Sequence, residues 1–130
     1  RTALVILLLV IGPCSPLFAS RLEHGRAERA SGMADARDRA RVLLELARTL
    51  DAGHPVEALA QRRTALHFAE QSKDLELVHR VLVELRRNEL DAGGLDGVLR
   101  ASLRALEVSQ QLERPALVAA DLAWLSRTYA

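Results

Sequence analysis

A forty-residue internal repeat constrains this chain more than any other feature of its sequence. Residues 50–66 match residues 90–106 at seven of 17 positions, and both segments begin with Leu-Asp-Ala-Gly. At the same offset, residues 64–90 match residues 104–130 at eight of 27 positions. A repeat of this length is one supersecondary unit, which buries its apolar face only by stacking against its neighbours. The repeat therefore predicts a stacked array of similar units.

Composition and apolar spacing predict that each unit contains two α-helices. Ala, Leu, Arg, Lys and Glu supply more than half of the 130 residues, a bias typical of long helices. Gly53 suits the end of one helix, and Pro55 and Pro115 suit the first turn of another. Asp74 is expected to cap the helix that follows it, and Gly93-Gly94 to close that helix. The residues that the helical period places inward are Leu43, Leu46, Ala47, Leu50, Leu59, Leu66, Phe68, Val78, Leu82, Leu85, Leu99, Leu103, Leu106, Leu122, Leu125 and Tyr129.

The repeat resembles the tetratricopeptide repeat (TPR). Positions four, seven, eight and eleven of that motif are similar in spacing to Leu122, Leu125, Ser126 and Tyr129, and also to Leu43, Leu46, Ala47 and Leu50. The resemblance covers about residues 40–130, and it implies an all-α fold, an α-solenoid of TPR-like hairpins in a domain of residues 34–130. The chain departs from the family in its period of 40, and Arg86 and Glu89 stand where a small residue and an aromatic are usual.

The N-terminal residues have the layout of an export signal. Residues 3–11 are an unbroken apolar run of nine, which is shorter than the roughly 20 residues that cross a bilayer. Helix breakers and small residues follow before the charged region, as in a secretory signal peptide. We expect residues 1–20 to be such a signal, cleaved after Ala19 or Ser20; an uncleaved anchor or a buried helix is the alternative. Residues 21–33 are expected to form a polar linker or a frayed lead-in.

The combination of a signal peptide and a long-period TPR array resembles the extracytoplasmic sensor regions of bacterial signalling proteins. This resemblance implies a periplasmic region that binds a protein or peptide. A membrane span and an output domain, either a GGDEF diguanylate cyclase or a histidine kinase, are then expected beyond residue 130. We expect the array to be truncated, because it stops at Ala130, where the next Asp-Ala-Gly turn is due. The alternatives are a free periplasmic TPR scaffold with no enzymatic domain, and a cytoplasmic helical regulator.

Charge and motif content argue against nucleic-acid binding and against catalysis within this chain. After residue 20 the basic and acidic residues balance at 17 each, which leaves no surplus of cations for a polyanion. No phosphate loop and no Ser/His/Asp set occurs, so we predict no catalytic residue and no cofactor. Zinc needs three or four converging ligands. We predict no metal site among the four histidines, although His67 and His79 lie on adjacent predicted helices and are close enough in sequence to approach each other.

A charged stripe recurs on the first helix of successive repeats. It consists of Arg41, Glu45 and Arg48 in one repeat and of Arg80, Glu84 and Arg87 in the next, with Ala120, Trp124 and Arg127 in the corresponding places of the third. Residues i, i+4 and i+7 share a helix face, and the TPR resemblance implies that first helices line a concave groove. The predicted partner-binding residues are therefore Arg41, Arg48, Arg80, Arg87, Trp124 and Arg127. The guanidinium groups of the arginines suit carboxylates or phosphate.

Each of these residues also has a purely structural interpretation. The stripe is also consistent with ordinary solvated ion pairs within each helix, because every Glu lies within reach of both Arg residues. Trp124 is interpreted either as an anchor for a partner or as packing between repeats. The pairs Arg62-Arg63 and Arg86-Arg87 are interpreted as solvated charges.

Overall fold

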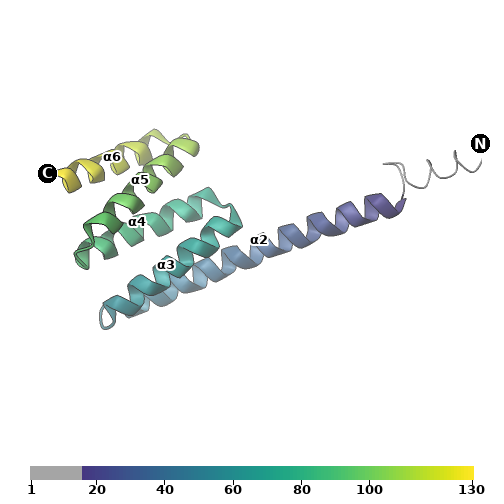
Figure 1. Ribbon diagram of the computed structural model, residues 1–130, viewed down its shortest axis with the longest axis horizontal. Coiled ribbons are helices and arrows are strands. Elements are labelled where there is room, and N and C mark those ends of the chain that lie inside the picture. The colour runs from purple at the N-terminus through teal and green to yellow at the C-terminus, as the bar shows by residue number, and fades with distance from the viewer. Residues whose placement is uncertain (1–15) are drawn as a thin grey trace, which may run out of the picture. The chain divides into compact units, whose positions relative to one another are not determined.

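Residues 16–130 are described by the computed structural model, and they form five helices and no strand. The helices are α2 (Pro16–Leu50), α3 (Pro55–Ser72), α4 (Leu75–Asp91), α5 (Leu95–Gln111) and α6 (Pro115–Tyr129) (Figure 1). The all-α prediction is confirmed for this part of the chain. The apolar run at residues 3–11, on which the signal-peptide prediction depends, lies outside it. Among the described helices, none combines the length and the apolar character that a membrane crossing requires.

The chain divides into two compact units, Arg1–Met33 and Ala34–Ala130. The described residues of the first unit belong to α2, so residues 21–33 are helical, where a polar linker or frayed lead-in was predicted. An ion pair of 3.0 Å joins His24 to Glu28 one turn later on this stretch. Pairs at this spacing stabilise a solvated helix by a few tenths of a kcal/mol each.

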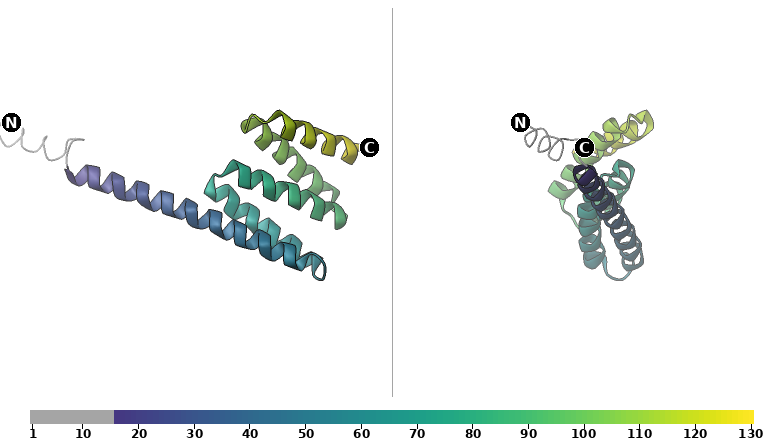
Figure 2. Two further views of the ribbon diagram at one scale, coloured as in Figure 1. Left: turned by 180° about the vertical axis from the view of Figure 1, so that it is seen from behind. Right: turned by 90° about the vertical axis from the view of Figure 1, so that its right-hand side faces the viewer.

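Within the second unit, helices that follow one another in the chain pack side by side. Successive contacts join α3 to α4, α4 to α5 and α5 to α6, and both views in Figure 2 show this succession. The sequence repeat is also a repeat of helix positions. Helix α3 begins at Pro55 and α5 at Leu95, forty residues later, and α4 and α6 begin at Leu75 and Pro115, with the same separation.

The turns after α3 and α5 share an unusual backbone conformation. Lys73 and Glu113 have φ angles of 57° and 55°, and they are the non-glycine residues of positive φ in the described chain. A left-handed residue at this position allows its amide to bond back to the last helical turn, as the Lys73 amide does to the Glu70 carbonyl at 3.2 Å. Gly93 is left-handed as well, with φ 77°, but Gly53 is not, although the sequence suggested it.

The features that the sequence predicted at the starts of three helices are present. Asp74 accepts a hydrogen bond from the Leu77 amide at 3.2 Å and so caps α4, while Pro55 and Pro115 occupy the first turns of α3 and α6. These features depend on a few neighbouring residues, which is why the sequence predicts them well.

The face that α2 buries differs from the predicted one. The predicted stripe was Leu43, Leu46, Ala47 and Leu50, whereas the buried stripe is Ala36, Ala40, Leu44 and Ala47. Leu46 is 43% exposed. The two stripes share Ala47, and Leu43 of the predicted stripe is partly buried against the core. The buried face consists mostly of alanine, because small side chains allow close packing of the helices.

At the other end of the unit, several residues that were predicted to face inward are exposed. They are Leu103, Leu122 and Tyr129, at 52%, 51% and 71%. Leu122 stands forty residues after Leu82, which is 1% exposed. Leu122 is more exposed than Leu82 because α4 packs against both α3 and α5, whereas α6 packs against α5 and no described helix follows it.

Candidate functional site

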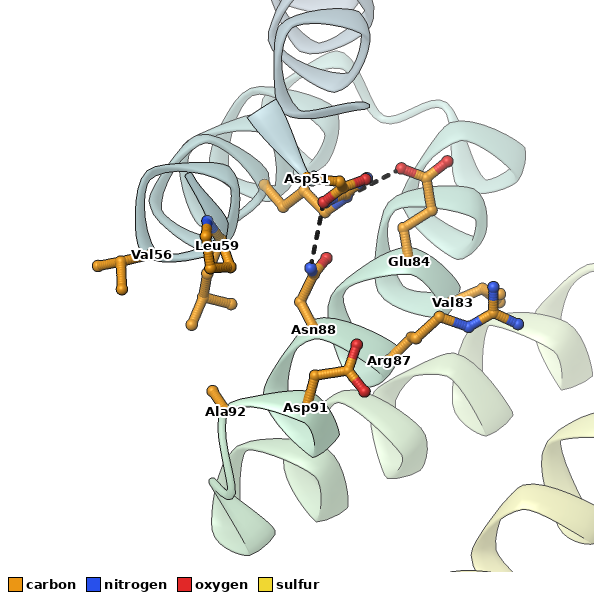
Figure 3. Close-up of a pocket in the computed structure, with 11 residues that line it drawn as sticks. Asp51, Val56, Leu59, Val83, Glu84, Arg87, Asn88, Asp91 and Ala92 are labelled. Atoms are coloured by element: carbon orange, nitrogen blue, oxygen red, sulfur yellow. Dashed lines mark hydrogen bonds and ion pairs between the residues drawn. The ribbon is translucent and has the colours of Figure 1, made fainter. Parts of the chain in front are cut away.

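A cavity of about 580 Å³ lies where the C-terminal part of α4 meets the start of α3. We call it the α3–α4 cavity. Val56 and Leu59 of α3 form an apolar side, and Glu84, Asn88 and Asp91 of α4 lie across from them (Figure 3). The cavity therefore offers one apolar wall and one polar wall.

Arg62 forms the floor of the polar side. It is only 4% exposed, and it donates through Nη1 and Nη2 to the two carboxylate oxygens of Asp51 at 2.5 and 2.7 Å. Its Nε donates to Glu84 at 3.1 Å. The hydrogen bond from Arg62 lowers the pKa of Asp51 below its ordinary value, so this carboxylate stays ionised. The interpretation of Arg62 as a solvated charge was therefore wrong, because two carboxylates from other segments cover it.

Glu84 joins this cluster to α2. Arg48 donates from Nε to Glu84 at 3.0 Å and also pairs with Glu45. The Asn88 amide donates to Asp51 at 3.4 Å. Arg48 and Arg62 are thus linked to three carboxylates, Glu45, Asp51 and Glu84, in one ionic network with an excess of one negative charge. The sequence suggested that Glu84 pairs with arginines of its own helix. In the structure it pairs instead with Arg48 of α2 and Arg62 of α3.

The structure distributes the other predicted groove residues over separate hollows. Arg87 lines the α3–α4 cavity, with its guanidinium pointing away from the Asp51–Asn88 bond (Figure 3). Arg80 lines a second hollow of about 360 Å³, and Trp124 and Arg127 line a third of about 180 Å³. Arg41 is exposed and lines none of these three.

Trp124 is half-buried and lies between two guanidinium groups. The Arg86 group is 4.8 Å from the centre of its ring, and the Arg127 group is 5.9 Å away. Cations over an indole face are attracted by its quadrupole. Trp124 therefore contacts the buried Arg86. With Leu90, Arg127 and Thr128 it also lines the third hollow, which we call the Trp124 hollow.

A second charged cluster is buried between α4 and α6. Asp121 has no exposed surface, and it accepts hydrogen bonds from Arg86 Nη1 at 2.7 Å and from His79 Nε2 at 2.8 Å. Burial alone would raise the pKa of Asp121, but hydrogen bonds from His79, Arg86 and Ser109 outweigh that effect and lower it. Arg86 is 3% exposed, so its interpretation as a solvated charge was also wrong.

The two histidines that the sequence placed on adjacent helices do not meet in a common site. His79 contacts Asp121, whereas the Nε2 atom of His67 lies 3.1 Å from the Gln71 amide nitrogen. Within residues 16–130, no three His, Cys, Asp or Glu side chains gather in a way that suits a metal ion.

Two departures from the TPR pattern turn out to mark buried charges. Arg86 is in the Asp121 cluster, and Glu89, which is 7% exposed, accepts from Arg63 Nε and Nη2 at 3.0 and 2.6 Å. Glu89 also lies against Gly97, where an added Cβ would stand 2.5 Å from its Oε2 atom. The sequence thus carried a signal for these two positions. It carried none that paired Arg62 with Asp51.

Comparisons with known proteins identify no relative of this chain. No family model matches the chain, and neither a curated protein nor a solved structure is significantly similar to it. The function is therefore argued from the site itself.

Proposed function

We propose that residues 34–130 form a TPR-like α-solenoid that binds a protein or peptide. In this proposal the chain is the N-terminal periplasmic sensor region of a bacterial membrane signalling protein, whose output domain, a GGDEF diguanylate cyclase or a histidine kinase, lies beyond residue 130. The observation that carries the proposal is the α3–α4 cavity, which is built on helices that recur every forty residues. Stacked helical hairpins provide extended concave surfaces of this kind, and helix-lined grooves recognise peptides.

The charges around the cavity support binding over a purely structural role. In the network around Arg48 and Arg62, both cations are committed to carboxylates, and these pairs link α2, α3 and α4. Arg87 and Asp91 also line the cavity, and no ion pair within residues 16–130 involves either of them. A preformed cavity with uncommitted charges binds a ligand without a large ordering cost.

The signalling context rests on the resemblance stated above. Ligand binding between α3 and α4 would alter the packing of successive repeats, and a membrane helix would carry that change to the output domain. Such a mechanism needs the ligand to favour one packing arrangement over another.

Peptide display on the purified chain tests the binding function. We expect enriched peptides to bind in calorimetry, and we expect Arg87→Ala to weaken them about tenfold, roughly 1.4 kcal/mol. Arg100→Ala is the matched control, since Arg100 is exposed on α5 and lines none of the three hollows. Failure to enrich any peptide, or equal weakening by both substitutions, would remove the support for this function.

Two observations test the context. An apolar segment of about 20 residues followed by a GGDEF or kinase domain in the reading frame past Ala130 would establish a sensor. Further repeats and a stop codon would instead establish a free periplasmic scaffold. Residues 1–20 found intact in the soluble mature protein would contradict export and favour the cytoplasmic regulator.

A further inference from the structure

The α3–α4 cavity and the Trp124 hollow occupy equivalent places in two successive repeats. Three residues of α4 line the α3–α4 cavity, and the residues forty positions later, on α6, line the Trp124 hollow. The pairs are Glu84 with Trp124, Arg87 with Arg127, and Asn88 with Thr128. The same positions on neighbouring first helices thus form both hollows.

An arginine lines each of the two hollows at the same position of the repeat. Arg87 and Arg127 are exposed, and neither forms an ion pair with a described carboxylate. Arg127 makes a 3.3 Å hydrogen bond from Nε to the Ala123 carbonyl, which leaves its other donors free. By contrast, Arg48, Arg62 and Arg86 are all committed to ion pairs. A guanidinium at the same position of each repeat suits the carbonyl oxygens that an extended peptide presents at regular intervals.

The remaining lining residues of the two hollows differ, so each hollow favours a different side chain of a bound peptide. In the α3–α4 cavity, Val56 and Leu59 suit an aliphatic stem, while Asp91 and Asn88 lie across from them (Figure 3). Asn88 donates its amide N–H to Asp51, so its carbonyl oxygen remains an acceptor. An apolar stem that ends in hydrogen-bond donors and a positive charge describes lysine or arginine.

The Trp124 hollow favours an apolar side chain. Its lining is Leu90, the indole of Trp124, Arg127 and Thr128, with no carboxylate. Two guanidinium groups already lie within 6 Å of the indole, at 4.8 and 5.9 Å, and they would repel a third cation. Its volume of about 180 Å³ admits a single side chain.

We infer that the two hollows are neighbouring subsites for one extended peptide, with a lysine or arginine side chain in the α3–α4 cavity and an apolar side chain in the Trp124 hollow. Helices α4 and α6 are in side-chain contact through Asp121. The backbones of α4 and α6 are not a closely packed helix pair in the described chain, so the two hollows are separated by at least the distance of about 8 to 10 Å between packed helix axes. Because an extended chain advances about 3.3 Å per residue, the two peptide residues are at least about three positions apart. This inference rests on the proposed peptide-binding function and specifies its ligand.

The test uses short synthetic peptides with the full chain. The probes contain one Lys and one Leu in either order, separated by two to about five Gly or Ser residues, with Lys replaced by Glu or Leu replaced by Ser in the matched set. Trp124 is the one tryptophan of the sequence, so its fluorescence reports occupation of its own hollow. We expect one of the two Lys/Leu orders to shift the Trp124 emission. Each replacement in that peptide should weaken binding by about tenfold, and the Leu→Ser peptide should lose the shift.

Protein variants locate the effect. Asp91→Asn should weaken the lysine peptide about tenfold while leaving a Lys→Gln peptide unchanged. Asp96→Asn is the matched control, because Asp96 is exposed on α5 and lines neither hollow. Circular dichroism verifies that each variant keeps its helices.

The outcomes separate this inference from the broader function. If display-selected peptides bind but lack the basic and apolar pair, or if Lys and Glu peptides bind equally, the inference is overturned and peptide binding stands. An unchanged Trp124 emission on saturation, or equal effects of Asp91→Asn and Asp96→Asn, overturns it in the same way. If neither synthetic nor displayed peptides bind, both proposals fail.

Discussion

Two charged junctions in this chain, one between α3 and α4 and one between α4 and α6, treat their charges in opposite ways. Around the α3–α4 cavity, Arg62 is buried while its partners Asp51 and Glu84 keep 41% and 21% of their side-chain surface. Between α4 and α6, Asp121 is completely buried, and its partner Arg86 is 4% exposed. The first junction therefore stays accessible to a ligand, whereas the second is a closed joint.

Two differences between the repeats explain the contrast. Glu84 corresponds to Trp124, whose indole covers Arg86, and Arg62 corresponds to Ser102, which is fully buried and too short to reach a distant carboxylate. Helices with the same spacing in the sequence therefore need not bury their charges in the same way, because the side chain at each repeated position decides whether water reaches the junction.

Removal of Asp121 should have the largest effect on stability. Asp121→Ala leaves Arg86 and His79 buried without their acceptor, which costs about 3 to 5 kcal/mol in the free energy of unfolding. Urea denaturation at neutral pH measures it. A loss below about 1 kcal/mol would show that water enters this junction and would remove the contrast.

Acid should weaken the closed junction by a smaller amount. Because the pKa of Asp121 is lowered in the folded chain, its contribution is complete above the unfolded value, about 3.9. It is lost as the pH falls through the lower folded value. Urea midpoints from pH 6 to pH 2 measure the loss. Asp121→Asn should reduce this dependence, whereas the exposed Asp96→Asn should preserve it; equal curves for the two variants would contradict the assignment.

The open junction should tolerate the loss of its central arginine better. Arg62→Met retains most of the buried volume, and Asp51 and Glu84 can turn toward water, so we expect a cost of about 1 to 2 kcal/mol. Arg86→Met is the matched variant, and it should cost more, because Asp121 has no access to water. The reverse order of the two unfolding free energies would refute the comparison.

A glycine tests the close contact between α4 and α5. Gly97→Ala would place a Cβ 2.5 Å from Glu89 Oε2 and displace this carboxylate from Arg63. We expect a net destabilisation of about 1 kcal/mol by thermal denaturation. In a Glu89→Ala background the same substitution should stabilise the chain by up to about 1 kcal/mol, through helix propensity alone. Destabilisation in both backgrounds would mean that Glu89 is not the obstacle.

The smallest effect should come from the rim of the open network. Arg48 is 43% exposed, and pairs of this kind contribute about 0 to 1 kcal/mol. Arg48→Ala should therefore lower the unfolding free energy only slightly, and less so in 1 M salt, which screens exposed charges. A large effect that salt does not change would indicate that the network is closed.

The sequence by itself determined the helices, their period and several of their ends. Pro55, Pro115 and the Asp74 cap act over one helical turn, so their effects are visible without the fold. The repeat likewise predicted the forty-residue separation of helix starts, because each hairpin depends mainly on its own residues.

Only the tertiary structure decided which faces and which charges are buried. Neighbouring residues on a helix point about 100° apart, and packing in the core that Ala40 and Leu44 share with α3, α4 and α5 buried the alanine face of α2 and left Leu46 exposed. The partners of Arg62 and Arg86 lie 11 to 35 residues away in the sequence. No local pattern encodes such pairs, because a buried charge is stable only where the fold brings its counter-charge within hydrogen-bond distance.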